Sequence, residues 1–246
     1  MARIQILAAA ISIAALSPAV DAQQIASEQD RREAIQFYRV GQEFLSGEQF
    51  EKAAEQFSRS VQKDRLLTLA HYGLGQSYMG LRRYASAARA FGDCLDAFKA
   101  LHSLQQSNRF EVERRRDDEI REMRENIRGL MQAGQTLRAT NAEARLRDLE
   151  RQKTSMEAPF QPPSEVLLAL GSALFRNGDA EAAMLQWEAA IGSNPKLGEA
   201  HNNLAVVYMQ AGRLADAERE IKLAEKNGFR VNPQFKDDLK ARSKSR

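Results

Sequence analysis

A period of 34 residues is the feature that most constrains the fold of this chain. The segment FYRVGQEFLSGEQFEKAAEQF at 37–57 returns as HYGLGQSYMGLRRYASAARAF at 71–91, and residues 167–195 return at the same offset as 201–228. In all four copies, small residues recur at two fixed places, with large apolar residues between them. Such a period predicts helical hairpins, because each hairpin buries its apolar face only when it stacks on a neighbour.

The small residues predict where the two helices of each hairpin approach most closely. One set falls in the first helix and the other in the second: Gly41, Gly75, Gly171 and Ala205, then Ala53, Ala87, Ala183 and Ala217. These residues and their shared register resemble the tetratricopeptide repeat (TPR) family over residues 34–101 and 164–231. The resemblance implies an all-α fold of TPR helical hairpins, an α-solenoid, with two repeat pairs separated by long charged helices.

Residues 109–157 interrupt the period with a segment rich in Arg and Glu. Gly134 is a natural helix break, and Thr140–Glu143 has the form of a capping box. We therefore expect two long helices, 109–136 and 141–157, in a hairpin or short coiled coil, through which a homodimer could form. One continuous helix joining the two repeat pairs is the alternative. Apolar residues fall at coiled-coil spacing only in the first part of the segment: Ile120, Met123, Ile127, Leu130 and Leu137.

The two ends of the chain and a short linker have patterns of their own. Residues 1–22 carry one early positive charge, an apolar run and small residues before Gln23, which is the layout of a secretory signal peptide. The alternative is a short uncleaved anchor or a buried helix. We expect an exported protein, periplasmic or secreted, with no stable membrane insertion after cleavage. Residues 158–163 form a proline-rich linker, and 232–246 form a C-terminal capping helix with a basic tail.

No residue pattern in the chain indicates catalysis. His71 and His201 take the same place in their repeats, and neither has a metal ligand three or four residues away. The single cysteine, Cys94, falls among apolar residues and has no catalytic partner nearby in the sequence. Phosphate-binding loops and nucleophile motifs are absent from the sequence. We expect no enzyme activity, no cofactor and no metal site.

The charge of the chain argues against nucleic acid as a partner. Its 36 basic and 33 acidic residues leave a net charge of only +3. Even the arginine-rich stretch 109–128 holds seven Arg and seven acidic residues, which is typical of a charged helix that screens itself. Export would also separate the protein from nucleic acid.

In the family, the first helix of each repeat lines a concave groove, so the resemblance implies which residues face a partner. Tyrosine and amide side chains at these places suit the backbone of an extended peptide or a partner helix. The alternative is that the tyrosines pack between repeats and that Asn203 bonds to the neighbouring repeat or stabilises the start of its own helix. The terminal-carboxylate clamp of one subgroup is absent, since Gly73 and Ala169 stand at two of its places. The predicted partner-binding residues are Tyr38, Gln42, Tyr72, Gln76, Asn202 and Asn203.

These observations favour a non-catalytic protein–protein interaction module, a scaffold of the cell envelope that binds a peptide or helix of a partner in concave TPR grooves. Two rival functions stay open. One is a structural protein that oligomerises through a coiled coil, and the other is an accessory subunit of an envelope enzyme or assembly machine.

Overall fold

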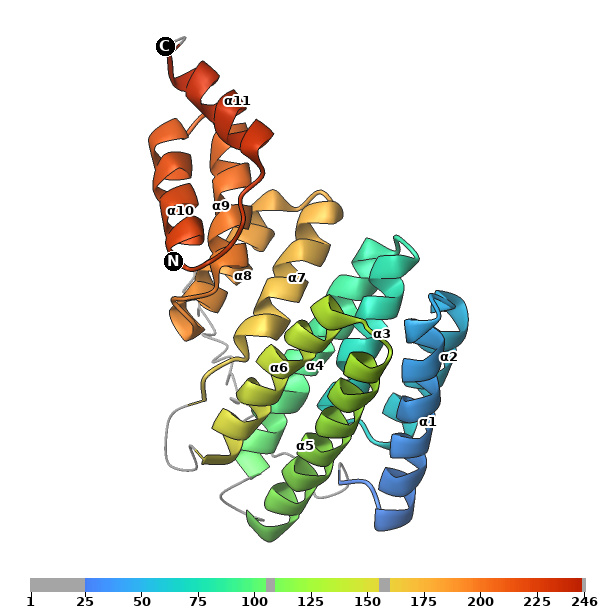
Figure 1. Ribbon diagram of the computed structural model, residues 1–246. Helices are drawn as coiled ribbons and strands as arrows, with labels where there is room; N and C mark the ends of the chain where they lie inside the picture. Colours follow the sequence, from blue (N-terminus) through green and yellow to red (C-terminus); the bar gives the residue numbers. More distant parts are fainter. Residues whose placement is uncertain (1–24, 105–108, 155–159, 245–246) are drawn as a thin grey trace, which may run out of the picture.

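The computed structural model describes residues 25–104, 109–154 and 160–244, and the regular elements in these ranges are all helices (Figure 1). The expected signal peptide, 1–22, and the first two residues of the linker lie outside the described residues. The helices are α1 (Glu28–Ser46), α2 (Phe50–Lys63), α3 (Thr68–Gly80), α4 (Tyr84–Leu104), α5 (Arg109–Gln132), α6 (Thr136–Thr154), α7 (Ser164–Arg176), α8 (Ala180–Ser193), α9 (Gly198–Gln210), α10 (Leu214–Lys226) and α11 (Pro233–Lys244).

Four helical hairpins, α1–α2, α3–α4, α7–α8 and α9–α10, confirm the predicted all-α fold of helical hairpins. The small residues have the expected role at the contacts between helices. A Cβ added at Gly41 would lie 2.7 Å from the ring of Phe57, and one at Gly171 would lie 2.5 Å from Trp187. Both aromatic side chains are almost fully buried. The matching alanines of the second helices, Ala53, Ala87, Ala183 and Ala217, are also fully buried.

The turn inside each hairpin has the same backbone form in all four repeats. One residue takes a positive φ, and the next amide donates a hydrogen bond to a carbonyl five residues back. In the last two repeats this residue is Gly178 or Gly212, which adopts a positive φ at little cost. In the first two repeats it is Glu48 or Arg82, with φ of 58° and 57°. These two side chains stand where a glycine is favoured.

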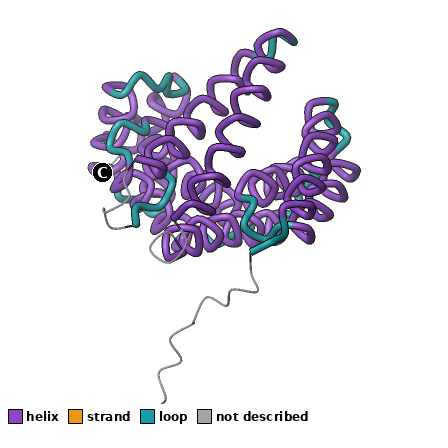
Figure 2. Tube along the Cα trace, turned by 90° about the horizontal axis from the view of Figure 1, so that it is seen from below, coloured by secondary structure: helices purple, strands orange, loops and turns teal. Residues whose placement is uncertain are grey.

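The two repeat pairs form one continuous array. Helix α4 packs directly on α7, so the second pair continues the stack although 59 residues separate Leu104 from Ser164 in the sequence. Figure 2 shows the helix pairs following one another along a curved path. Helices α5 and α6 therefore do not separate the pairs as a spacer. They form a hairpin that leaves the array and returns to it.

The start of the second charged helix differs from the prediction. Helix α6 begins at Thr136 and runs through Thr140 without interruption. Gly134, with φ of 70°, makes the turn after α5, and the amide of Gln135 already bonds to the carbonyl of Leu130. The hydroxyl of Thr140 donates to the carbonyl of Thr136, 3.1 Å away, and so is not the predicted cap. Because the chain turns at Gly134, α6 begins before the capping-box sequence, and no new helix begins at Thr140.

Helix α11 covers the apolar end of the last repeat. The side chain of Asn232 accepts a hydrogen bond of 2.9 Å from the amide of Gln234, which is the capping contact expected before Pro233. Leu239 is buried, and Phe235 packs against the same apolar cluster as α9 and α10. None of the described helices has the length and apolar character that a membrane span requires.

Candidate partner-binding grooves

The α5–α6 hairpin lies against the concave side of the first repeat pair, where α1 and α3 are exposed to it (Figure 1). A buried ion pair links it to the first repeat. The Nη1 atom of Arg115 donates to both carboxylate oxygens of Asp64, at 2.9 and 2.7 Å, and each side chain is 4% exposed. One turn further along α5, the Glu119 carboxylate accepts from the Thr68 hydroxyl at 2.5 Å and from the Thr68 amide at 3.3 Å. The hairpin thus provides hydrogen-bond acceptors for Thr68, the first residue of α3.

Apolar contacts fill the space between these polar anchors. Three of the buried residues belong to the hairpin, Ile120, Met123 and Leu149, and they share one cluster with Tyr38 and Phe57 of the first repeat. Most of the apolar seam that predicted a coiled coil is therefore used within the chain. Leu137, the last residue of the predicted seam, lies at the hairpin tip and is 77% exposed. The seam fails there because α5 ends at Gln132.

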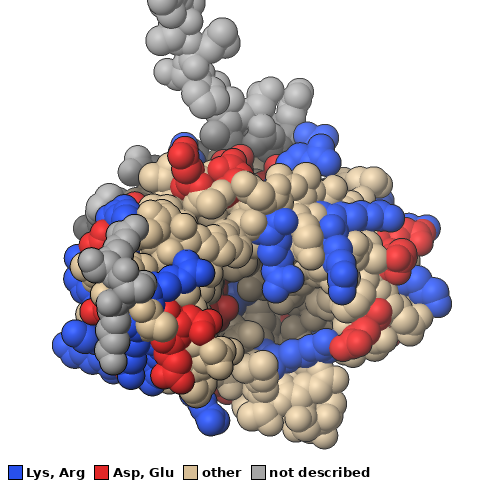
Figure 3. Space-filling view, turned by 90° about the horizontal axis from the view of Figure 1, so that it is seen from above, with Lys and Arg blue, Asp and Glu red and all other residues tan. Residues whose placement is uncertain are grey.

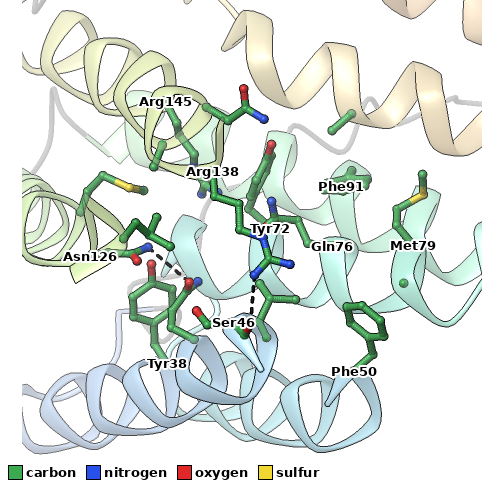
Figure 4. Close-up of a pocket in the computed structure, with 18 of the residues that line it drawn as sticks. Tyr38, Ser46, Phe50, Tyr72, Gln76, Met79, Phe91, Asn126, Arg138 and Arg145 are labelled. Atoms are coloured by element: carbon green, nitrogen blue, oxygen red, sulfur yellow. Dashed lines mark hydrogen bonds between the residues drawn. The ribbon is translucent and has the colours of Figure 1, made fainter. Parts of the chain in front are cut away.

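The structure brings Tyr38 and Gln42 of α1 against the hairpin. Tyr38 is 2% exposed, and burial raises the pKa of its hydroxyl to about 12. The Gln42 side-chain oxygen accepts a hydrogen bond of 3.2 Å from Asn126 of α5 (Figure 4). Beside them, Arg39 pairs with Glu122 through both of its fork nitrogens. These two predicted residues therefore contact the chain's own hairpin, and whether they also contact a partner stays a prediction.

Tyr72 and Gln76 lie one repeat further along the groove, on α3. The Tyr72 ring packs at 5.3 Å, edge to face, on Phe91 of its own repeat, and the guanidinium of Arg145 of α6 lies over the Tyr72 ring, 3.8 Å from its centroid. Burial is the main reason why the pKa of Tyr72 is raised. Gln76 is exposed and faces the same space. Both tyrosines therefore pack within the chain, as the alternative interpretation expected, and a role in binding a partner stays a prediction.

A cavity of about 390 Å³ remains where the hairpin leaves part of this groove open. Figure 4 shows side chains of α1, α3 and the hairpin pointing into it. Its wall combines four kinds of group: apolar side chains, the amides of Gln42, Gln76, Asn126 and Asn141, the tyrosines, and two arginines. Figure 3 shows a hollow in the face seen from above, with Lys and Arg side chains along much of its rim.

Asn202 and Asn203 lie far from this cavity in the array, on α9 of the last repeat. Both are half-buried, and the amide of Asn202 donates a long bond of 3.5 Å to Asn203. In the described part of the chain, neither side chain has another hydrogen bond. The alternative in which Asn203 bonds to a neighbouring repeat has no contact to support it among these residues. The structure therefore does not bring all six predicted residues into one site.

His71 and His201 each lie within hydrogen-bond distance of a backbone carbonyl. His71 Nε2 lies 2.8 Å from the carbonyl of Arg65, and His201 Nε2 lies 3.2 Å from that of Pro195, which is the matching place one repeat pair later. The other nitrogen of His201 pairs with Glu220 at 2.7 Å. Cys94 is fully buried, and burial raises its pKa to about 12. Among the described residues, no group of three or more His, Cys, Asp or Glu is placed to hold a metal ion.

Sequence reasoning missed the residues that fix the hairpin, Arg115, Glu119 and Arg145. Burial outweighs the nearby Thr68 and Arg145 and raises the pKa of Glu119 to about 7. On α5, Arg115 and Glu119 are four residues apart, beside the apolar Ile120. A charged stripe next to an apolar one was the available signal. Charge spacing alone, however, does not distinguish a solvated stripe from a buried one.

Comparisons with known proteins place this geometry in a family. The model of the tetratricopeptide repeat family matches residues 38–100, 133–196 and 168–228. The middle range begins in the segment that the sequence analysis set apart, so it includes α6 with α7 and α8. A search of the curated proteins gave no match.

Several solved structures are similar to the chain at low identity. The PilF protein of Pseudomonas aeruginosa is 13% identical, over 85% of this chain and 82% of that one, with a TM-score of 0.37. PilW, described as a widely conserved type IV pilus biogenesis factor, is 14% identical over the same shares, with a TM-score of 0.38. YrrB, described as a TPR protein with an unusual peptide-binding site, is 18% identical over 82% and 89%, with a TM-score of 0.28.

Proposed function

The chain belongs to the tetratricopeptide repeat family, and we propose that it is a non-catalytic scaffold of the cell envelope that binds a peptide or helix of a partner protein. Protein–protein interaction is the general role of this family. We place the partner in the concave groove of the second repeat pair, beside Asn202 and Asn203. The cell envelope follows from the signal-peptide pattern of residues 1–22.

The single observation that carries this proposal is that, among the described residues, the side chains of Asn202 and Asn203 have no hydrogen-bond partner except each other. Their amides carry donors and acceptors on the side of α9 that the family resemblance assigns to the groove, and they bond to each other only at 3.5 Å. An asparagine in a helix competes with the backbone and favours helix less than alanine does. Binding of these amides to the backbone of another chain would explain why two residues of low helix propensity stand in a first helix. By contrast, the hairpin already occupies much of the first groove at Tyr38 and Gln42.

The apolar residues around the asparagines favour a segment with an apolar face. Val206 stands one turn along α9 and is half-buried, and Phe175 of α7 is half-buried as well. We infer an amphipathic helix or an extended peptide with apolar side chains as the bound segment. A homodimer through residues 109–157 remains the structural alternative. Among the described side chains of that segment, the exposed large apolar ones are Met131 and Leu137 at the hairpin tip.

The test is site-specific photo-crosslinking. A photoreactive amino acid at Val206 of the full chain, expressed in its own host, should crosslink to one partner segment, which mass spectrometry then identifies. A synthetic peptide of that segment should bind the purified mature protein. The double variant Asn202→Ala/Asn203→Ala should weaken this binding by about tenfold, since two hydrogen bonds of about 1 kcal/mol each are lost in part.

Gln210→Ala is the matched control, because Gln210 is exposed on the same helix at its far end. It should leave the peptide affinity unchanged. Alanine favours helix, so neither variant should unfold α9. Equal affinities of the wild type and the double asparagine variant for the peptide would refute this placement of the partner.

A further inference from the structure

The 390 Å³ cavity between the first repeat pair and the hairpin has a one-sided charge. Of the described residues that line it, Arg138 and Arg145 carry a charge, and none is an Asp or Glu. The absence of acidic side chains from the described wall contrasts with the charged hairpin α5–α6, in which acidic and basic residues alternate. Both arginines lie on α6 and so come from the inserted hairpin rather than from the repeats.

Arg145 is the deeper of the two and is 4% exposed. Its Nη2 donates to the carbonyl of Thr68 at 3.0 Å, and its guanidinium lies over the ring of Tyr72. The Nε–H has no acceptor among the described residues. The buried carboxylate of Glu119 accepts its hydrogen bonds from Thr68 instead. A buried guanidinium with an unused donor is costly, and an anion in the cavity would remove that cost.

Arg138 stands where α6 crosses the end of α1. Its Nη1 donates to the carbonyl of Ser46 at 3.1 Å, and its Nη2 lies 3.4 Å from the exposed Glu48. Figure 4 shows both arginines extending from α6 into the same space, with the Arg138 contact to Ser46 drawn as a dashed line. Arg138 is more exposed than Arg145, so its charge contributes less to binding.

The rest of the wall is largely apolar. Leu45, Met79, Phe91 and Met123 line it from four different helices. Methionine side chains adapt to ligands of different shape. A volume of this size lies within the range of small-molecule sites, about 300–1,000 Å³. The cavity therefore has apolar walls and, at Arg145, a cationic group with an unused hydrogen-bond donor.

We propose that this cavity binds an apolar carboxylate, with the carboxylate at Arg145 and the apolar body between Met79 and Met123. A free medium-chain acid and the C-terminal end of an apolar peptide share this chemistry. The site is independent of the partner groove proposed above, because none of the residues that line it lies on α9. A ligand there would bridge the repeats and the hairpin and so hold the hairpin in place.

Four probes separate charge from apolar contact and one source from the other. Octanoate is compared with octanol, and the tripeptide acetyl-Ala-Leu-Leu with a free carboxylate is compared with its C-terminal amide. Titration calorimetry on the full mature chain measures binding. Each acid should bind at least about tenfold more tightly than its neutral counterpart, since charge-assisted hydrogen bonds are lost in the latter. Binding of octanoate alone indicates a free acid as the ligand, and binding of the tripeptide acid alone indicates a polypeptide end.

Three variants test whether the probes bind in the cavity. Ala142→Leu should abolish binding by filling space, since Ala142 lines the cavity, whereas Ala144→Leu on the same helix should not, since Ala144 is not part of the wall. Arg145→Met should weaken acid binding by at least about tenfold and leave the neutral probe unaffected. Circular dichroism checks the fold of each variant, and Ala142→Leu keeps the test valid if Arg145→Met unfolds.

Two results would overturn the proposal. One is equal affinity for acid and neutral probes, which removes the role of the arginines. The other is an affinity for the acids that Ala142→Leu leaves unchanged. The absence of measurable binding of either acid to the folded wild type would refute the proposal as well.

Discussion

Replacement of Glu119 by glutamine should make the protein less sensitive to rising pH. Burial raises the pKa of this carboxyl from 4.5 to about 7 in the folded state. Between these two values the folded chain keeps a proton that the unfolded chain releases, so the free energy of unfolding falls as pH rises. The difference between the two pKa values corresponds to about 3 kcal/mol in the free energy of unfolding, and this contribution is fully lost above the folded pKa. In Glu119→Gln the side chain cannot ionise, and its amide oxygen still accepts from the Thr68 hydroxyl.

The assay is urea denaturation of wild type and Glu119→Gln at about pH 5 and about pH 8.5. The stability of the variant relative to wild type should rise by about 2 to 3 kcal/mol between these two pH values. The wild type retains other pH-dependent groups, above all Glu165, whose pKa burial and the neighbouring Asp148 also raise to about 7. The difference between the two proteins removes their contribution.

Glu43→Gln is the matched control, because Glu43 is exposed on α1. Its stability relative to wild type should stay constant with pH. The reasoning is wrong if the relative stability of Glu119→Gln changes by less than about 0.5 kcal/mol over the same range. That result would mean that Glu119 ionises in the folded state at little cost and that the hairpin is not packed tightly over it.

Three further predictions concern the turn, the thiol and the ion pair. Arg82→Gly should stabilise the fold by up to about 1 kcal/mol in thermal or urea unfolding, because Arg82 has a positive φ; a loss of stability would contradict this. Cys94 should react with a thiol reagent at neutral pH only as fast as the chain unfolds, since it is buried with a raised pKa; rapid labelling of the folded protein would disagree. Arg115→Met should cost about 3 to 5 kcal/mol by leaving Asp64 buried and unpaired, and Arg115→Met/Asp64→Leu should recover most of it; equal losses in both would count against the pair.

The sequence was sufficient for the repeats because their contacts are local. Gly41 and Phe57 lie within one hairpin, and the same pairing of small and large residues returns with every period. A residue's place in the repeat therefore predicts its neighbours. The N-cap at Asn232 and the burial of Cys94 followed from equally local patterns. The start of α6 was predicted wrongly because a positive φ at Gly134 and a capping box six residues later are competing local signals.

The partner-binding residues could be predicted only in part. Their position on the first helices followed from the register, but which of them remain free depends on the hairpin. Gln42 bonds to Asn126, 84 residues away, and Arg115 bonds to Asp64, 51 residues away. No periodicity connects these partners. A balanced stripe of charges has the same sequence whether it faces water or a groove.

By itself, the sequence determined the helices, their pairing into four hairpins and the residues that let them pack closely, because each of these depends on spacing within one or two repeats. The tertiary structure alone decided that the two pairs form one array and that the charged hairpin returns to cover the first groove. It also decided that Arg138 and Arg145 meet at one cavity. These outcomes depend on how the burial of apolar surface and of paired charges balances across distant segments, which no local pattern records.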